Sequence, residues 1–308
     1  MKKNSIKGKK TGGELVLDIF KVFFVLLVSI VCVYPFWNIF IISINDGQDA
    51  LRGGLYFWPR VFTLENYQEI LRRSEFVRAI GVTVLRTLIG TPLVVLVTSM
   101  LAYVLSRSEL LGKKFWTLMF IFTMYFSGGM VPSYLLVKSL GLINTRAALV
   151  LVSGISIYNL IVTRTYFTTS ISDSIYEAAK IDGAGELKTF LSIALPLAKP
   201  IVAVMVLYYA VAHWNDYFNA LLYVSDKNLE PLQSVLRRVL IQNQNALDES
   251  MMQQSMQPGE MLDSAKRAYA AYTMKYTMVF IASAPLLIAY PFVQKYFVKG
   301  VMVGAVKE

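Results

Sequence analysis

Six long apolar stretches, separated by shorter charged segments, dominate this chain of 308 residues. Each stretch is long enough to cross a bilayer core about 30 Å thick, which takes about 20 helical residues. Charged residues make up only 16% of the chain, against about a quarter in a typical soluble domain. We therefore expect an all-α integral membrane protein with a transmembrane domain over 16–297 and spans at 16–44, 79–105, 115–137, 147–167, 197–224 and 276–297.

The positively charged residues predict how these spans are oriented. The net charge is +10, and the lysines gather beside the apolar runs, which favours membrane topology over nucleic-acid binding as their explanation. The basic segment 1–15 and the tail 298–308 are therefore expected in the cytoplasm, as are loops 106–114 and 168–196, whereas 45–78 and 225–273 lie outside. The first apolar run is too long for a signal-peptide core and lacks a small-residue cleavage site, so we expect it to stay as a span.

Several classes of chemistry are excluded by residue counts. The chain has one cysteine, Cys32, and one histidine, His213, both within apolar runs. A single cysteine cannot form an internal disulfide, and a single histidine leaves no His-rich metal site. The lysine-containing stretches 8–11 and 112–114 lack the preceding glycine of a phosphate-binding loop. We therefore expect no catalytic residue, metal or cofactor in this chain.

The most informative segment is 174–196, which begins Ser-Ile-Tyr-Glu-Ala-Ala-Lys-Ile-Asp-Gly-Ala-Gly and ends Ile-Ala-Leu-Pro. Ser174 followed three residues later by Glu177 is a capping-box pattern for the start of a helix. Gly183 ends that helix, and a second short helix at 186–193 leads to the proline that opens the fifth span. Taken singly, the cap, the turn and the proline are each consistent with a purely structural role. A face of small side chains follows the helical spacing and could let another protein approach: Ile175, Ala178, Ala179 and Asp182.

The spacing of this segment resembles the EAA loop of the permease subunits of ABC importers. Every position of that motif is matched: Glu177, Ala178, Ala179, Gly183, Ile193, Leu195 and Pro196. The runs 180–184 and 290–300 resemble the carbohydrate branch of these permeases, which includes maltose-type members, and within it the lipoprotein-linked oligosaccharide type. The resemblance covers nearly the whole chain and implies a type I ABC importer permease fold with cytoplasmic coupling helices.

The resemblance also implies partners and residue roles. The chain would pair with a second homologous permease in a bacterial plasma membrane, with two ATP-binding subunits that hold ATP and Mg, and with an extracellular solute-binding lipoprotein that delivers a carbohydrate. Glu177 would cap the coupling helix and meet the ATPase, Ala178 and Ala179 would permit close packing, and Gly183 would make the bend. Pro196 would fix the elbow into the fifth span. Asp182, Ile193 and Leu195 complete the expected coupling surface.

Polar and aromatic side chains within the spans are candidates for the substrate path, because such groups in a membrane often face a cavity. Aromatic faces and carboxylate or amide groups suit sugars, so we select Tyr125, Asn159, Trp214, Asn215, Asp216, Tyr217 and Asn219. Interfacial anchoring of the aromatic rings and packing between helices are the alternatives for this set.

Three other functions are weighed against the carbohydrate importer. An ABC permease for another solute, such as a peptide or a polyol, would keep the same fold. A secondary transporter would need intramembrane acidic residues for ion coupling, for which Asp216 is the one convincing candidate, and it would leave the EAA loop unexplained. An intramembrane enzyme would need paired carboxylates, His ligands or a Ser-Lys dyad, which the spans do not supply.

Overall fold

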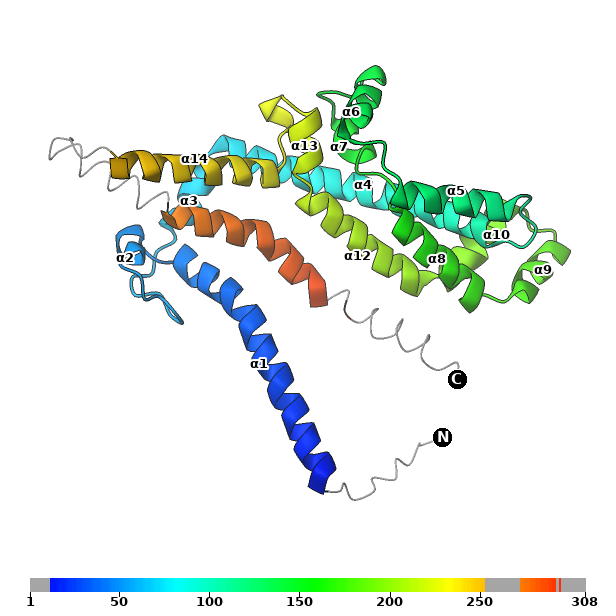
Figure 1. Cartoon of the computed structure of the whole chain (residues 1–308), viewed down its shortest axis with the longest axis horizontal. Helices are drawn as coiled ribbons and strands as arrows, with labels where there is room; N and C mark the ends of the chain where they lie inside the picture. The colour runs from blue at the N-terminus through cyan, green and yellow to red at the C-terminus, as the bar shows by residue number, and fades with distance from the viewer. Residues whose placement is uncertain (1–11, 253–271, 292–293, 295–308) are drawn as a thin grey trace. The chain divides into compact units, whose positions relative to one another are not determined.

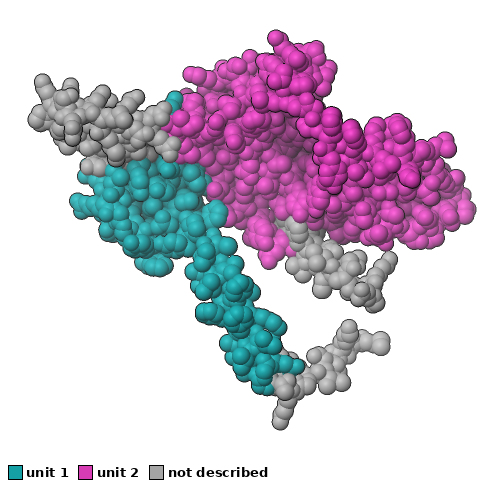
Figure 2. All heavy atoms as spheres, viewed as in Figure 1, with its two compact units in different colours: residues 1–70, 242–281 teal, residues 71–241, 282–308 magenta. Residues whose placement is uncertain are grey.

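The computed structural model describes residues 12–252, 272–291 and 294, which are helical apart from turns and one isolated antiparallel bridge between Asn45 and Phe62. The all-α class expected from the sequence is confirmed (Figure 1). The chain divides into two compact units, one of residues 1–70 and 242–281 and the other of residues 71–241 and 282–308 (Figure 2). Each unit is described by itself.

The first unit begins with α1 (Gly12–Ser43), a helix of 32 residues that covers the first expected span. Its 18-residue apolar core is 0% buried within the chain, so its apolar side chains face outward on all sides. A helix that is apolar all round is stable only where lipid or another apolar surface surrounds it. The C-terminal third of α1 packs within the unit, where Asn38 donates to the carbonyl of Leu55 and where Ile41 and Ile42 join Ile44, Ala50 and Leu55 in a small core.

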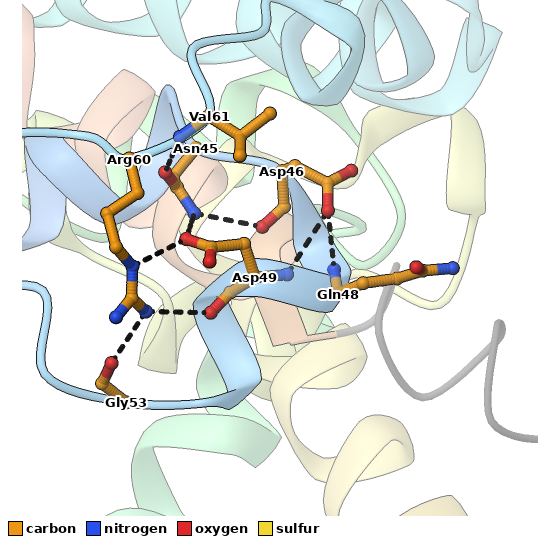
Figure 3. A network of polar contacts seen from close by, with 7 residues as sticks. All are labelled: Asn45, Asp46, Gln48, Asp49, Gly53, Arg60 and Val61. Carbon is orange, nitrogen blue, oxygen red and sulfur yellow. Dashed lines mark hydrogen bonds and ion pairs between the residues drawn. The ribbon is translucent and has the colours of Figure 1, made fainter.

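A short polar network fixes the chain that follows α1 (Figure 3). α2 (Gly47–Leu51) begins at Asp46, whose carboxylate accepts hydrogen bonds from the backbone N–H groups of Gln48 and Asp49. The Asp49 carboxylate accepts 2.9 Å hydrogen bonds from the Asn45 amide and from Nε of Arg60. Asn45 also accepts from the backbone N–H of Val61, so one buried amide joins both arms of this loop.

The first unit is completed by parts of two more helices. α3 (Glu65–Arg72) starts after Thr63, whose hydroxyl accepts from the N–H of Glu65. The helix Tyr272–Pro291 covers most of the sixth expected span, and the hydroxyl of its Thr273 donates to Asn66 of α3. The rest of that span, 292–297, is outside the described residues apart from residue 294, and the terminal segments 1–11 and 298–308 are also outside them.

The second unit is built around α4 (Ser74–Ser106), a helix of 33 residues that covers the second expected span. It packs against α8 (Ile157–Ser170) and α12 (Lys199–Asn215), as Figure 1 shows. Small and medium side chains such as Ala102, Ala194 and Ala198 are completely buried between these elements. Close contact of this kind is how helices associate where no hydrophobic effect drives them together.

Two of the expected spans are sharply bent. α5 (Lys113–Tyr125) and α6 (Met130–Ser139) meet at 114° across a break that contains Gly128 and Gly129. The segment Glu186–Leu197 meets α12 at 85°, and α12 itself ends at Asn215, before the end expected at 224. The described residues contain three helices long and apolar enough to cross a membrane, or five if each bent pair is one span.

Shorter helices connect these elements. α7 (Arg146–Leu151) and α8 are separated by residues 152–156, so the expected fourth span at 147–167 is two short helices, and six crossings stay a prediction. The expected outer loop 225–273 contains structure of its own, since α14 (Leu232–Met252) is a helix of 21 residues that extends into the polar segment expected to be a loop. After α12 the chain forms α13 (Phe218–Tyr223) and the 3-10 turn η2 (Lys227–Leu229).

Candidate functional site

The loop between α8 and α12 contains the helix that the sequence predicts. α9 (Asp173–Ile181) begins two residues earlier than the capping-box pattern implies, because Ser172 is the N-cap and its hydroxyl accepts from the N–H of Ser174. The capping-box assignment to Ser174 and Glu177 is therefore wrong. Ser172 is the N-cap because its backbone is extended, with φ −68° and ψ 142°, as an N-cap requires, whereas Ser174 is already helical. Glu177 is thereby released from capping, and its side chain is exposed.

The glycine bend is confirmed at Gly183. Its φ of 72° lies in the left-handed region, which costs an L-residue about 1–2 kcal/mol. The N–H of Ala184 donates to the carbonyl of Ala179 at 2.9 Å, and that of Gly183 donates to Lys180 at 3.1 Å. Such a bond across the left-handed residue is how helices commonly end. Gly183 thus reverses the chain between α9 and α10 (Glu186–Thr189).

The faces of α9 differ from the small-residue surface expected. Ala179 is 4% exposed and packs within its own unit beside Tyr176, so it is not available for another protein. The sequence pattern could not distinguish the two alanines, because they are adjacent and both small. Ala178, Glu177 and Asp182 lie on exposed surface, where a partner can reach them.

Side chains of the neighbouring loop 106–114 hold α9 in place. The guanidinium of Arg107 lies 4.2 Å from the centre of the Tyr176 ring, a cation–π contact. Burial raises the pKa of the Tyr176 hydroxyl, and the charge of Arg107 opposes that rise. On the exposed side, Lys180 pairs with Glu109 at 3.1 Å, and this hydrogen bond lowers the pKa of the Glu109 carboxyl. Exposed ion pairs stabilise little, so the aromatic contact is the main anchor.

A second anchor joins α4 to the short helix after the bend. The Tyr103 hydroxyl donates to the Glu186 carboxylate at 2.7 Å, and its ring lies against Phe167, Tyr176 and Phe190 at centroid distances of 5.4 to 6.2 Å. One residue of α4 thus contacts α8, α9, α10 and the turn that follows α10. This arrangement makes the loop 172–198 a packed extension of the helical core.

The elbow into α12 lies later than expected. After α10 the chain continues through a π-helical turn, η1 (Phe190–Ala194), and α11 (Leu195–Leu197), in which Pro196 is exposed. The 85° bend falls at Ala198, and Pro200 occupies the first turn of α12. The assignment of the elbow to Pro196 is therefore wrong, since the bend falls two residues after Pro196 and Pro200 is the proline in the first turn of α12. Ile193 and Leu195 are half-buried on the inner side of this segment.

Bulky apolar side chains point away from the core of this loop. Ile181 at the end of α9 is 86% exposed, and Leu187 of α10 is 62% exposed. The two residues flank the Gly183 bend. Apolar side chains exposed beside a rigid turn indicate a surface that another protein covers. Together with Glu177, Ala178 and Asp182 they form the surface expected to meet an ATPase, which we term the coupling surface.

The residues selected for a substrate path separate into buried and exposed groups. Asp216 follows α12 and accepts from Ser153 Oγ at 2.5 Å and from Asn219 Nδ2 at 2.9 Å. It also pairs with the guanidinium of Arg86 on α4, which additionally donates to the Asp216 carbonyl at 2.8 Å. The side chains of Asp216 and Asn219 are therefore hydrogen-bonded to other residues of this chain.

The remaining candidates can be sorted in the same way. Trp214 is 8% exposed and donates its indole N–H to the carbonyl of Ala282, and Asn159 is buried within α8. The exposed candidates are Tyr125, Asn215 and Tyr217, of which Tyr217 lies under Arg237 at 5.4 Å. The structure does not bring the seven residues together in one cavity, and their contact with substrate stays a prediction.

Arg86 is a buried polar residue that no sequence motif singled out. It lies in the middle of an apolar span, and its side chain is 1% exposed, so it needs a buried anionic partner. A lone arginine in the second span and a lone aspartate at the end of the fifth were the available signal for this pair. Among the residues that the structure describes, no cluster of three or more His, Cys, Asp or Glu side chains could hold a metal.

Long apolar helices, one of them exposed on all sides, and an anchored loop with an exposed apolar turn define a membrane-embedded subunit of a larger assembly. Residues 67–303 match the family of binding-protein-dependent transport system inner membrane components, and the chain belongs to this family. The resemblance of the EAA loop to that of ABC importer permeases therefore predicted the family correctly.

Individual relatives agree with this assignment. The chain is 36% identical to protein LplC of Bacillus subtilis (strain 168) over 298 residues, which cover 96% of this chain and 97% of that protein. It is also 36% identical to the polygalacturonan/rhamnogalacturonan transport system permease protein YtcP of the same organism, over 92% of this chain and 96% of the relative. The fold matches a chain of a bacterial ABC transporter involved in the import of the acidic polysaccharide alginate, with a TM-score of 0.79, 27% identity and coverage of 94% and 100%.

Proposed function

We propose that this chain is the permease subunit of an ATP-driven importer for a carbohydrate, namely an oligosaccharide, delivered by an extracellular solute-binding lipoprotein. The family assignment supports the importer class, and relatives named for polygalacturonan and alginate transport support the carbohydrate cargo. A second homologous permease and two ATP-binding subunits complete the assembly. ATP and Mg are held in those subunits, so this chain contributes transport and not catalysis.

The observation that carries the proposal is the coupling surface at the Gly183 bend. Glu177, Ala178 and Ile181 are exposed on a helix whose other face is anchored by Tyr176 to Arg107. A rigid helix held at one face and open at the other can transmit a displacement from an ATPase cleft into the spans. ATP binding then biases an equilibrium between inward-facing and outward-facing states, which is the ordinary thermodynamics of a two-state element.

The anchors give this displacement a route. Tyr103 links the loop to α4 through Glu186, and the elbow at Ala198 links it to α12. Because α4 and α12 pack against each other, movement of the loop is delivered to both helices. In the orientation we propose, the segment 1–15, the loop 168–196 and the tail 298–308 are cytoplasmic in the plasma membrane, and 225–273 faces the binding protein.

A specific contact weighs against the main alternative. A secondary transporter would use Asp216 for ion coupling, but this carboxylate is paired with Arg86 and bonded to Ser153 and Asn219. An aspartate with a permanent cationic partner is a poor site for a transported cation. An ABC permease for a solute other than a sugar keeps the same coupling surface and differs only in cargo.

The proposal is tested by isolating the tagged chain from its native membrane in mild detergent and identifying the co-purifying proteins by mass spectrometry. We expect an ATPase with a phosphate-binding loop and a second permease of the same family. The solute-binding protein recovered with them is then screened against oligosaccharides. Recovery of the chain alone in several detergents would overturn the assembly, and binding only of a non-sugar solute would overturn the cargo.

A further inference from the structure

A cavity of about 460 Å³ lies against the first half of α4, outside the coupling surface. Its α4 wall is formed by residues that share one face of the helix at spacings of three and four residues: Arg78, Gly81, Val82, Leu85, Arg86 and Ile89. The opposite wall comes from α7, with Arg146, Leu149 and Val150, and from Asn228 of η2. We term this cavity the arginine groove.

The charged side chains that line the arginine groove are all positive. Three arginines line it and no carboxylate does. Arg78 and Arg146 are exposed, and they make no hydrogen bond or ion pair with the residues that the structure describes. Arg86 is satisfied by Asp216 on one edge of its guanidinium, but its buried Nε has no hydrogen-bond partner among these residues. A cavity with this lining attracts an anion with several acceptor oxygens.

The rest of the lining is apolar, which decides the kind of anion. Val82, Leu85 and Ile89 on one side and Leu149 and Val150 on the other provide hydrocarbon walls. From Arg78 to Ile89 the helix rises by about 17 Å, at about 1.5 Å per residue. A soluble sugar or phosphate would bury polar groups against these walls without partners. A phospholipid has both parts, a phosphate for the arginines and an acyl chain for the walls.

We propose that the arginine groove binds one anionic phospholipid, with the headgroup phosphate between Arg78 and Arg146 and an acyl chain along Leu85 and Ile89. This goes beyond the transport function and does not depend on which solute is carried. The site lies at the Ser74 end of α4, where a long helix that crosses the bilayer reaches the headgroup region. Bound lipid would fill the space between α4 and α7 next to the Arg86–Asp216 pair.

The test is native mass spectrometry of the complete importer, titrated with phosphatidylglycerol and, separately, with phosphatidylcholine of the same acyl chains. We expect one tightly retained phosphatidylglycerol, and at least about tenfold weaker retention in the Arg78→Gln/Arg146→Gln variant, because each charge-assisted contact contributes about a factor of ten. Arg52→Gln is the matched control, since Arg52 is also exposed and lies outside the groove. Arg78→Lys/Arg146→Lys should retain the lipid within a few-fold.

A second variant tests the apolar part of the groove. A side chain at Gly81 would enter open space, so Gly81→Leu should fold and block the acyl chain. Equal retention of both lipids, or unchanged retention in the arginine and Gly81→Leu variants, would overturn the proposal. Competition by soluble glycerol phosphate as strong as that by the lipid would also overturn it in favour of a soluble anion. Binding to the isolated subunit but not to the assembled importer would overturn it in favour of a subunit interface.

Discussion

Arg86 of α4 and Asp216 at the end of α12 form an ion pair between residues 130 positions apart in the chain. The pair ties together the two helices through which we propose that the coupling loop acts on the membrane domain. Its arginine side chain is 1% exposed and its aspartate side chain 14%, so neither charge is solvated once the other is removed.

Removing one partner of this pair should destabilise the permease strongly. Asp216→Asn or Arg86→Met leaves an unpaired buried charge, which costs about 3–5 kcal/mol, whereas the double substitution Arg86→Met/Asp216→Leu should cost less than either single change. The measurement is the unfolding temperature of the purified subunit in detergent. If Asp216→Asn kept wild-type stability and altered only the KM for the sugar, Asp216 would be a substrate contact and not a structural ion pair.

The close approach of α4 and α12 gives a second prediction at Gly90. A Cβ added there would lie 2.7 Å from Nε2 of His213 and 2.8 Å from its Cε1, closer than real contacts allow. Gly90→Ala should therefore destabilise the subunit by about 1–3 kcal/mol, the usual cost of overpacking a core.

Gly81→Ala on the same helix is the control, because a Cβ there meets open space. It should be neutral or stabilising by up to about 1 kcal/mol, from the higher helix propensity of alanine. His213→Ala should recover most of the loss in the Gly90→Ala background. Equal unfolding temperatures for Gly90→Ala and Gly81→Ala would contradict the contact.

The coupling surface predicts a separation of transport from ATP hydrolysis. Glu177→Lys reverses an exposed charge without touching the anchors of α9, so the importer should assemble and insert but lose uptake relative to ATP hydrolysed. Glu65→Lys, an exposed charge reversal at the start of α3, is the control and should transport normally. The ratio of sugar taken up to ATP consumed is measured in proteoliposomes. Normal coupling in the Glu177→Lys variant would show that Glu177 is not part of the coupling surface.

The bend at Gly183 can be tested with its neighbour. Any L-residue at Gly183 must adopt a φ near 72°, so Gly183→Val should distort the coupling surface and reduce uptake. Gly185 has a φ of −70° and a Cβ there meets open space, so Gly185→Ala should have no effect. Uptake by membranes that contain equal amounts of each variant distinguishes the two positions. Similar losses at both would indicate general intolerance of the loop to substitution.

The stability of the loop after α1 should vary with pH because of the Asp49 carboxyl. The hydrogen bond from Asn45, reinforced by Arg60 and opposed by burial, holds the pKa of the Asp49 carboxyl below its ordinary value of 3.8. A lowered pKa in the folded state stabilises the loop above pH 3.8, and this contribution is lost as the pH falls through the lower, folded-state pKa.

Hydrogen exchange of the amides of residues 45–61, corrected for the intrinsic rate at each pH, measures this effect. Protection should fall on acidification in the wild-type protein, and it should be lower but less dependent on pH in Asp49→Asn. The same acid-dependent loss in both proteins would assign it to another group.

The helical class and the coupling loop could be predicted from the sequence because their signals are local. The length of the apolar runs predicts the long helices. Gly183 predicts the turn, since glycine readily adopts positive φ. The N-cap is Ser172 and not Ser174, and the elbow lies at Ala198, before Pro200, and not at Pro196. In both places two similar residues lie within a few positions of each other, and only the backbone conformation distinguishes them. The Arg86–Asp216 pair and the bends of 114° and 85° depend on packing between distant segments, which no local pattern encodes.

We propose that the Gly183 bend contacts an ATPase, and Ile181 is the position at which this contact can be tested most directly, because it is 86% exposed at that bend. A photoreactive benzoylphenylalanine in place of Ile181, irradiated in native membranes, should form a cross-link to an ATPase subunit that is identified by mass spectrometry. The same group in place of Tyr56, which is 61% exposed and lies in the segment proposed to be extracellular, should not reach the ATPase. Cross-linking of the ATPase from position 56 but not from position 181 would contradict both the coupling surface and the proposed orientation.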